Sequence, residues 1–175
     1  MNRAYKYIFY PSLIIYIFFL IWGLLFTSED FVQGNSYRII YLHVPASFLS
    51  QSLYAAMAIA SVIYLVWRVK LAAYLIISIA PIGAIVTFIA LFSGSVWGIP
   101  TWGTWWQWDA RITSTIILFI MYLGLISLHA SFSNYEKADK LLSWLVIVGF
   151  VNICLLYTSD AADEGLGVDL GGRRI

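Results

Sequence analysis

Hydrophobic residues occur in long uninterrupted blocks along this chain, and most charged residues lie in the short stretches between the blocks. Several blocks reach roughly 20 residues, the length at which an α-helix crosses the hydrocarbon core of a bilayer. A segment in lipid has to satisfy its own backbone hydrogen bonds, so each block is expected to be a helix. The pattern predicts membrane spans at residues 7–26, 46–67, 71–92, 112–130 and 141–153.

The composition agrees with this pattern. Hydrophobic residues make up 62% of the chain and charged residues 11%, whereas a soluble domain carries about 25% charged residues. The predicted fold class is therefore all-α, a polytopic transmembrane helical bundle with five helices in this chain. The first block follows a positively charged start, as in a signal peptide, but no small-residue cleavage site follows it. We therefore expect it to remain as the first membrane helix.

The positions of lysine and arginine predict the orientation of the spans. Cations lie before the first span, between the second and third, and between the fourth and fifth: Arg3, Lys6, Arg68, Lys70, Lys137 and Lys140. The opposite loops, 27–45 and 93–111, contain only two cations, Arg38 and Arg111. Because cytoplasmic loops are enriched in cations, we expect a cytoplasmic N-terminus and outward-facing loops at 27–45 and 93–111.

The last residues, 154–175, differ from the rest and read CLLYTSDAADEGLGVDLGGRRI. They resemble the translated read-through of a sequencing adapter. We therefore expect a membrane domain at residues 1–153 and a non-native tail at 154–175, which would cut the fifth helix short. A genuine disordered tail is the alternative, since its glycine and aspartate content would allow it. Cys154 is the single cysteine, so the chain's own thiols are not expected to carry redox chemistry.

Five tryptophans crowd into the segment WGIPTWGTWWQWDARIT at residues 97–113: Trp97, Trp102, Trp105, Trp106 and Trp108. An aromatic belt at the membrane–water interface would explain one or two of them. If the chain is helical from Trp102, then Trp102, Trp105, Trp106 and Asp109 share one face, although Pro100 and Gly103 oppose a helix start here. Such a face would be a flat aromatic shelf, suited to a large planar apolar ligand.

The sequence WGTWWQWDARIT resembles the tryptophan-rich WWD signature of the heme-handling superfamily. Two further stretches, GNSYRIIYLHVP and APIGAIVTFIA, resemble heme exporter protein C, the CcmC family of cytochrome c maturation. The resemblance covers residues 22–153 and implies six helices in an intact member, where this chain has five. It also implies heme b as ligand and a bacterial inner-membrane location. The implied partners are a periplasmic heme chaperone, a small single-helix subunit, and ABC-type permease and ATPase subunits.

His43, in the motif YLHVP, is the candidate ligand of the heme iron, because histidine is a standard axial ligand. From the residues alone, an interfacial histidine that hydrogen-bonds locally is the alternative. The resemblance implies heme contacts at His43, Trp97, Trp102, Trp105, Trp106, Trp108 and Asp109. It further implies a second axial histidine after the fifth helix. The only other histidine here is His129, at the cytoplasmic end of the fourth span, where we expect a structural role.

Asp109 has two possible roles, as a cap of the fourth helix or as part of the heme motif. Arg38 or Arg111 could pair with a heme propionate. The chain has neither a Walker A motif nor a catalytic triad, so it is not expected to be an enzyme.

The predicted function is a membrane subunit that binds heme at the periplasmic face and hands it to a chaperone. The alternatives are a heme transporter, which would need polar residues inside the spans, and a cytochrome c heme lyase of the same superfamily. A purely structural membrane subunit would leave the tryptophan cluster unexplained.

Overall fold

The computed structural model describes residues 4–165, with side chains described at 5–156. Its elements are α1 (Ala4–Phe26), a short 3-10 helix η1 (Asn35–Ile39), α2 (Ile40–Trp67), α3 (Lys70–Trp102), α4 (Ala110–Ser131) and α5 (Tyr135–Gly165). Five helices are long and apolar enough to cross a membrane, and no strand forms within residues 4–165. The predicted class, an all-α polytopic bundle, is confirmed.

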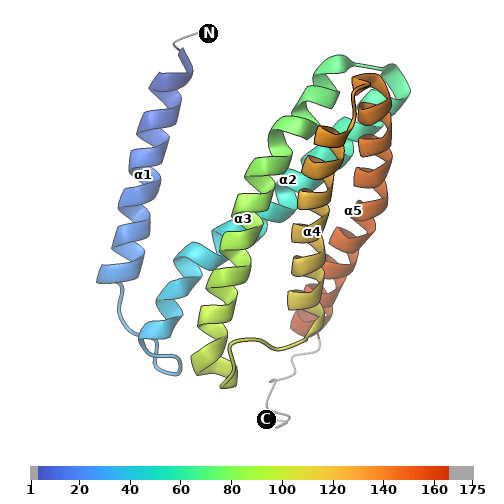
Figure 1. Ribbon diagram of the computed structural model, residues 1–175. Helices are drawn as coiled ribbons and strands as arrows, with labels where there is room; N and C mark the ends of the chain where they lie inside the picture. Colours follow the sequence, from blue (N-terminus) through green and yellow to red (C-terminus); the bar gives the residue numbers. More distant parts are fainter. Residues whose placement is uncertain (1–3, 166–175) are drawn as a thin grey trace.

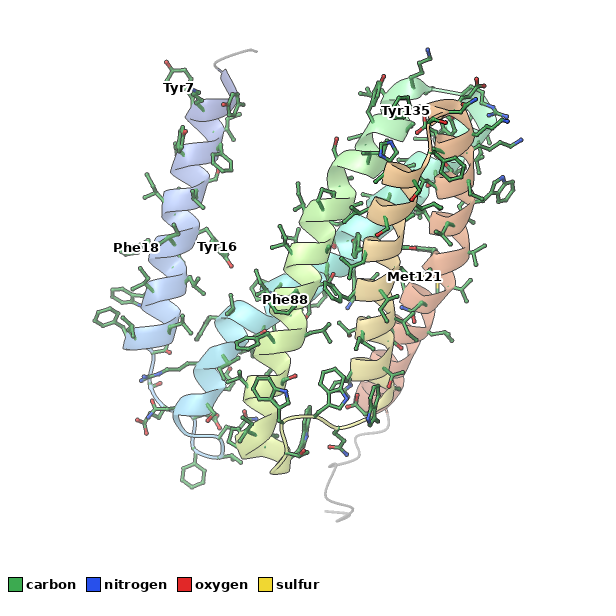
Figure 2. The ribbon with its side chains drawn as sticks, in the orientation of Figure 1. Tyr7, Tyr16, Phe18, Phe88, Met121 and Tyr135 are labelled. Carbon is green, nitrogen blue, oxygen red and sulfur yellow. The ribbon has the colours of Figure 1, made fainter. Side chains whose placement is uncertain are left out.

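The helices α2 to α5 pack together, and α1 stands apart from them (Figure 1). α2 runs obliquely across the bundle and packs against both α3 and α5, while α4 packs between α3 and α5. α1 is almost fully exposed, and its Phe18 points away from the other helices (Figure 2). An apolar helix with so few protein neighbours is stable in this form only where lipid surrounds it.

The core is formed by buried residues of α2, α3, α4 and α5. Alanines line the seam between α2 and α3, which lets the two backbones approach closely. Tyr54 and Tyr122 are both fully buried, and their rings meet edge to face at 5.4 Å. The Tyr122 hydroxyl donates a hydrogen bond to the Ser50 carbonyl at 2.8 Å, so its polar atom is satisfied inside the bundle.

The chain direction brings the tryptophan-rich segment and His43 to the same end of the bundle. α2 begins there, α3 ends there and α4 begins there (Figure 1). The cations Arg68, Lys70 and Lys137 lie at the opposite end, where α2 meets α3 and α4 meets α5. Which of these ends faces the cytoplasm stays a prediction.

Two expected boundaries near this end were wrong. The third span was expected to end at residue 92, but α3 continues to Trp102, so most of the expected loop 93–111 is helical. The helix ends at Gly103, whose φ of 73° is accessible to glycine and whose N–H bonds the Ile99 carbonyl at 3.0 Å. The second span was expected to begin at residue 46, but α2 begins at Ile40 and therefore includes His43.

The expected helical face of tryptophans does not form. Of the four residues expected on this face, only Trp102 is helical, because residues 103–109 form a bent, irregular connection between α3 and α4. The left-handed Gly103 breaks the 3.6-residue period before Trp105 and Trp106 are reached, so these residues share no helical face with Trp102.

The fifth span also differs from its expected end at residue 153, because α5 continues to Gly165. It therefore runs through the first part of segment 154–175. The non-native origin of that segment, and with it the domain division at residue 153, stays a prediction; residues 166–175 lie outside the described part of the chain.

Candidate functional site

A cavity of about 590 Å³ opens between α2, α3 and α4 at the tryptophan-rich end of the bundle, with Leu156 of α5 in its wall. Its volume falls within the roughly 300–1,000 Å³ that small-molecule and cofactor sites occupy. A smaller cavity of about 220 Å³ lies near the opposite end, among apolar residues of α3, α4 and α5, with His129 at its wall. The larger cavity is the candidate functional site, because the predicted ligand residues gather at it.

Four of the seven predicted site residues line this cavity: His43, Trp97, Trp102 and Asp109. They come from the start of α2, the end of α3 and the residue before α4. His43 is up to 66 residues from the others in the chain, so the packing of α2 against α3 brings it to them. Their role as heme contacts stays a prediction.

The other three tryptophans lie outside the cavity lining. Trp105 turns back onto α3 and meets the Phe92 ring at 5.7 Å in an edge-to-face contact. Trp106 and Trp108 contact each other in the same manner at 5.4 Å. Trp108 is 72% exposed, so its indole is available at the surface of the loop rather than inside the site.

His43 lies in the first turns of α2 and faces α3. Its Nδ1 lies 3.0 Å from the Ala90 carbonyl oxygen and 3.1 Å from the Ser93 hydroxyl. Gly94 makes this approach possible, since a Cβ there would lie 2.8 Å from the His43 Cε1. The imidazole is therefore held firmly against α3 at the cavity wall.

Trp97 supports the same imidazole from the side. Its ring meets the His43 ring at 5.7 Å with an interplanar angle of 70°. Its Nε1–H donates a hydrogen bond to Gln33 Oε1 at 2.8 Å, which ties the turn Asp30–Gly34 to α3. The Asp30 carboxylate closes this turn by accepting from the Val32 and Gln33 amides. The connection before α2 is thus joined to the cavity wall through one indole.

Asp109 caps α4, which confirms one of the two roles considered for it. Its backbone is extended and its Oδ1 accepts a hydrogen bond from the Ile112 amide at 2.7 Å. The carboxylate also stands at the cavity lining, so the cap and a ligand contact are compatible.

Two arginines were considered as partners of a heme propionate, and only one of them lines the cavity. Arg111, two residues after Asp109, lines the cavity. Arg38 lies outside the lining, and its Nη2 donates to the Thr27 carbonyl at 2.6 Å. Of the two, Arg111 is therefore placed to meet a carboxylate in the site.

The sequence reasoning missed the hydroxyls and the amide that line the cavity beside His43: Ser47, Ser50, Gln51, Ser95, Thr101 and Thr115. A signal for part of this set was present, because His43, Ser47 and Gln51 follow i, i+4 and i+8 within an apolar block. Ser93 and Gly94 were also missed, since nothing local indicates that α3 packs against the His43 ring at this point.

His129 lies at the other end of the bundle, in the last turn of α4, where its ring contacts Tyr135 at 5.8 Å. α2 begins at the end of the bundle where α4 begins, so the two histidines are separated by the length of α4 (Figure 1). No cluster of three or more metal-binding side chains forms among the described residues. His43 is thus the one imidazole that the described fold places at the larger cavity.

Comparisons with known proteins agree with one another. The family model described as "Heme exporter protein C" matches residues 1–161. Among curated relatives of that name, the one from Escherichia coli K12 is 50% identical over 139 residues, 79% of this chain and 57% of the relative. The Haemophilus influenzae relative is 45% identical over 140 residues, covering 80% and 57%. The Paracoccus denitrificans relative is 44% identical over 132 residues, covering 75% and 54%. The chain thus spans just over half the length of these relatives.

Proposed function

Because the chain belongs to the heme exporter protein C family, we propose that it is a heme-handling membrane subunit of a cytochrome c maturation system. In this proposal heme is the cargo, held at the larger cavity and passed on from there. The observation that carries the proposal is the imidazole of His43, fixed against α3 on the wall of a cavity that two indoles also line.

The residues at the cavity suit the chemistry of heme. A porphyrin is a flat apolar ring with two carboxylates, and its iron accepts a histidine nitrogen as axial ligand. Trp97 and Trp102 offer apolar indole surface for the ring at little cost in conformational entropy. Arg111 offers a cation for a propionate, by a charge-assisted hydrogen bond. His43 offers the nitrogen.

We further propose that the cavity opens on the periplasmic side and that heme leaves it to a periplasmic chaperone. Support comes from the cations, of which Arg68, Lys70 and Lys137 lie at the end of the bundle away from the cavity. The exposed Trp108 stands in the loop beside the cavity, where an acceptor protein would approach. The single-helix subunit and the ABC-type permease and ATPase subunits remain proposed partners, and the chain itself is proposed not to be an enzyme.

A heme transporter is the second candidate, because hydroxyls and an amide line the cavity within the membrane helices. The cavity, however, lies at one end of the bundle. Among the described residues, the buried hydroxyls nearer the middle or the other end, Ser61, Thr87 and Ser143, bond to carbonyls of their own helices. The described residues therefore favour a binding site near one surface over a polar path through the membrane.

The test of heme binding is a titration of the purified chain with hemin in detergent. A Soret band typical of histidine-ligated heme should appear with the unaltered chain and be lost or shifted to a non-histidine form in His43→Ala. His129→Ala is the matched control. It removes the other histidine of the chain, which lies at the far end of the bundle. A normal spectrum and affinity in His43→Ala would remove His43 as ligand and refute the proposed site.

A further inference from the structure

We infer that the structure assigns His43 to the Nδ1–H tautomer, with Nε2 as the ligating atom, and that Ser93 is the positioning residue that helps to fix this state. The inference rests on the proposed function, because it names how the chain prepares its imidazole for the iron. It concerns the contacts that His43 of α2 makes with Ala90 and Ser93 of α3.

The Ala90 carbonyl decides the tautomer. Its oxygen lies 3.0 Å from His43 Nδ1, and a carbonyl oxygen can only accept a hydrogen bond. An unprotonated Nδ1 would put two lone pairs against each other at this distance, so Nδ1 carries the hydrogen. In a neutral imidazole the other nitrogen, Nε2, then has the free lone pair that a metal requires.

Ser93 supplies a second acceptor for the same N–H. The Ser93 hydroxyl donates to the Ile89 carbonyl at 2.7 Å, one turn earlier in α3, and the Ala90 carbonyl is a second, longer acceptor at 3.2 Å. Its own hydrogen is engaged with either carbonyl, and its lone pairs are left to accept from Nδ1–H, which is 3.1 Å away. The N–H is shared between a carbonyl and a hydroxyl, and both acceptors belong to one rigid helix.

The opposite nitrogen has only a long contact. Nε2 lies 3.5 Å from the Ser47 hydroxyl, which is longer than an ordinary hydrogen bond, and in the Nδ1–H tautomer it could only accept from that hydroxyl. Both His43 and Ser47 line the cavity. A Cβ at residue 94 would lie 2.8 Å from Cε1, so the ring can take this position only beside a glycine. The Nδ1–H bonds and the absent Cβ therefore together determine where the Nε2 lone pair points.

Hydrogen bonds to the outer N–H of a ligating histidine orient the ring and raise its basicity as a ligand. Replacing Ser93 by alanine removes one of the two acceptors and leaves the Ala90 carbonyl. We expect heme affinity to fall roughly tenfold, the lower part of the range for lost partners of metal ligands. We also expect the midpoint potential of the bound heme to rise, because a less basic imidazole stabilises ferric iron less.

The first experiment needs no heme. The chain is labelled with ¹⁵N in its two histidine rings, and His129→Gln assigns the signals in detergent. His43 should show a protonated Nδ1 and an unprotonated Nε2 in the unaltered chain. In Ser93→Ala the ¹⁵N shift of Nδ1 should move toward that of a more weakly hydrogen-bonded N–H. A dominant Nε2–H tautomer in the unaltered chain would overturn the inference, whatever the chain does with heme.

The second experiment measures hemin affinity and midpoint potential in Ser93→Ala. Thr87→Val is the matched control, because Thr87 is a fully buried hydroxyl of the same helix that bonds the Gly83 carbonyl and does not touch His43. Ser93→Thr, which keeps the hydroxyl, should restore the potential toward that of the unaltered chain. Equal potentials and ¹⁵N shifts in Ser93→Ala and the unaltered chain would refute a positioning role for Ser93. Failure of the unaltered chain to bind hemin would instead refute the proposed function, and the ¹⁵N result would still decide the tautomer.

Discussion

At the scale of single residues, the site depends on how closely an imidazole can approach a helix. His43 reaches the Ala90 carbonyl and the Ser93 hydroxyl because residue 94 has no side chain. A glycine in a helix interior costs about 1 kcal/mol relative to alanine. At Gly94 this cost is offset by two polar contacts that hold the ring in one orientation. Close packing, rather than backbone flexibility, explains the glycine here, because it lies inside the regular helix α3.

Gly94→Ala should therefore disturb the site while leaving the helix intact. The added Cβ would lie 2.8 Å from His43 Cε1, so the ring must move away from its acceptors on α3. We expect hemin affinity to fall by about tenfold or more, as when the partners of a metal-bound histidine are lost. Gly124→Ala is the control, since a Cβ at that position of α4 meets nothing within 4 Å. Equal hemin affinities in the two variants would contradict this account of Gly94.

At the scale of elements, the start of α4 serves two purposes at one residue. Asp109 ends the segment 103–109 and caps the helix by accepting the Ile112 N–H. The same carboxylate lies at the cavity lining next to Arg111. The capping role follows from the sequence, since aspartate directly before an apolar helix is a strong start signal. The position at the cavity depends on the packing of α4 against α3 and α5.

The two roles of Asp109 can be separated by two substitutions. Asp109→Ala should lower the free energy of unfolding by about 1 kcal/mol through loss of the cap. Asp109→Asn should keep the cap, because asparagine caps about as well as aspartate. Thermal unfolding in detergent measures the stability that the cap contributes. Hemin titration measures the affinity that a ligand contact of Asp109 would contribute. A melting temperature that falls as far in Asp109→Asn as in Asp109→Ala would contradict the capping role.

At the scale of the whole molecule, the bundle has two chemically different ends. One has His43, the tryptophan-rich segment and the larger cavity. Within residues 27–165, the other has most of the lysines and arginines: Arg68, Lys70, Lys137 and Lys140. α1 lies beside this bundle with little protein contact and reaches α2 through a short connection that includes η1 (Figure 1). Polarity along the bundle axis is what a subunit needs if it is to present a ligand at one membrane surface only.

The orientation of these ends can be measured by cysteine labelling in intact cells. In a Cys154→Ser background, Trp108→Cys should react with a membrane-impermeant thiol reagent, because Trp108 is exposed in the segment before α4. Lys137→Cys, near the start of α5, should react only after the membrane is permeabilised. The reverse pattern would place the larger cavity at the cytoplasmic surface and exclude direct transfer to a periplasmic acceptor.

The sequence alone determined the helical class and the five spans, because lipid leaves an apolar segment no other way to satisfy its backbone. It also indicated a cap at Asp109 as one of two possible roles, and the structure confirms this local interaction. It could not give the end of α3, since the Gly, Ser and Pro residues at 93–102 are typical of a loop, yet the segment is helical.

Only the tertiary structure decided which aromatic residues face the site. Trp97 and Trp102 line the cavity, whereas Trp105, Trp106 and Trp108 lie outside its lining, although all five lie within twelve residues of the chain. The hydrogen-bond partners of His43 could likewise not be predicted from the sequence, because Ala90 and Ser93 are 47 and 50 residues away from it. Contacts between helices depend on how the backbones cross, and the crossing of α2 and α3 is set by small residues along their whole seam rather than by the residues at the site.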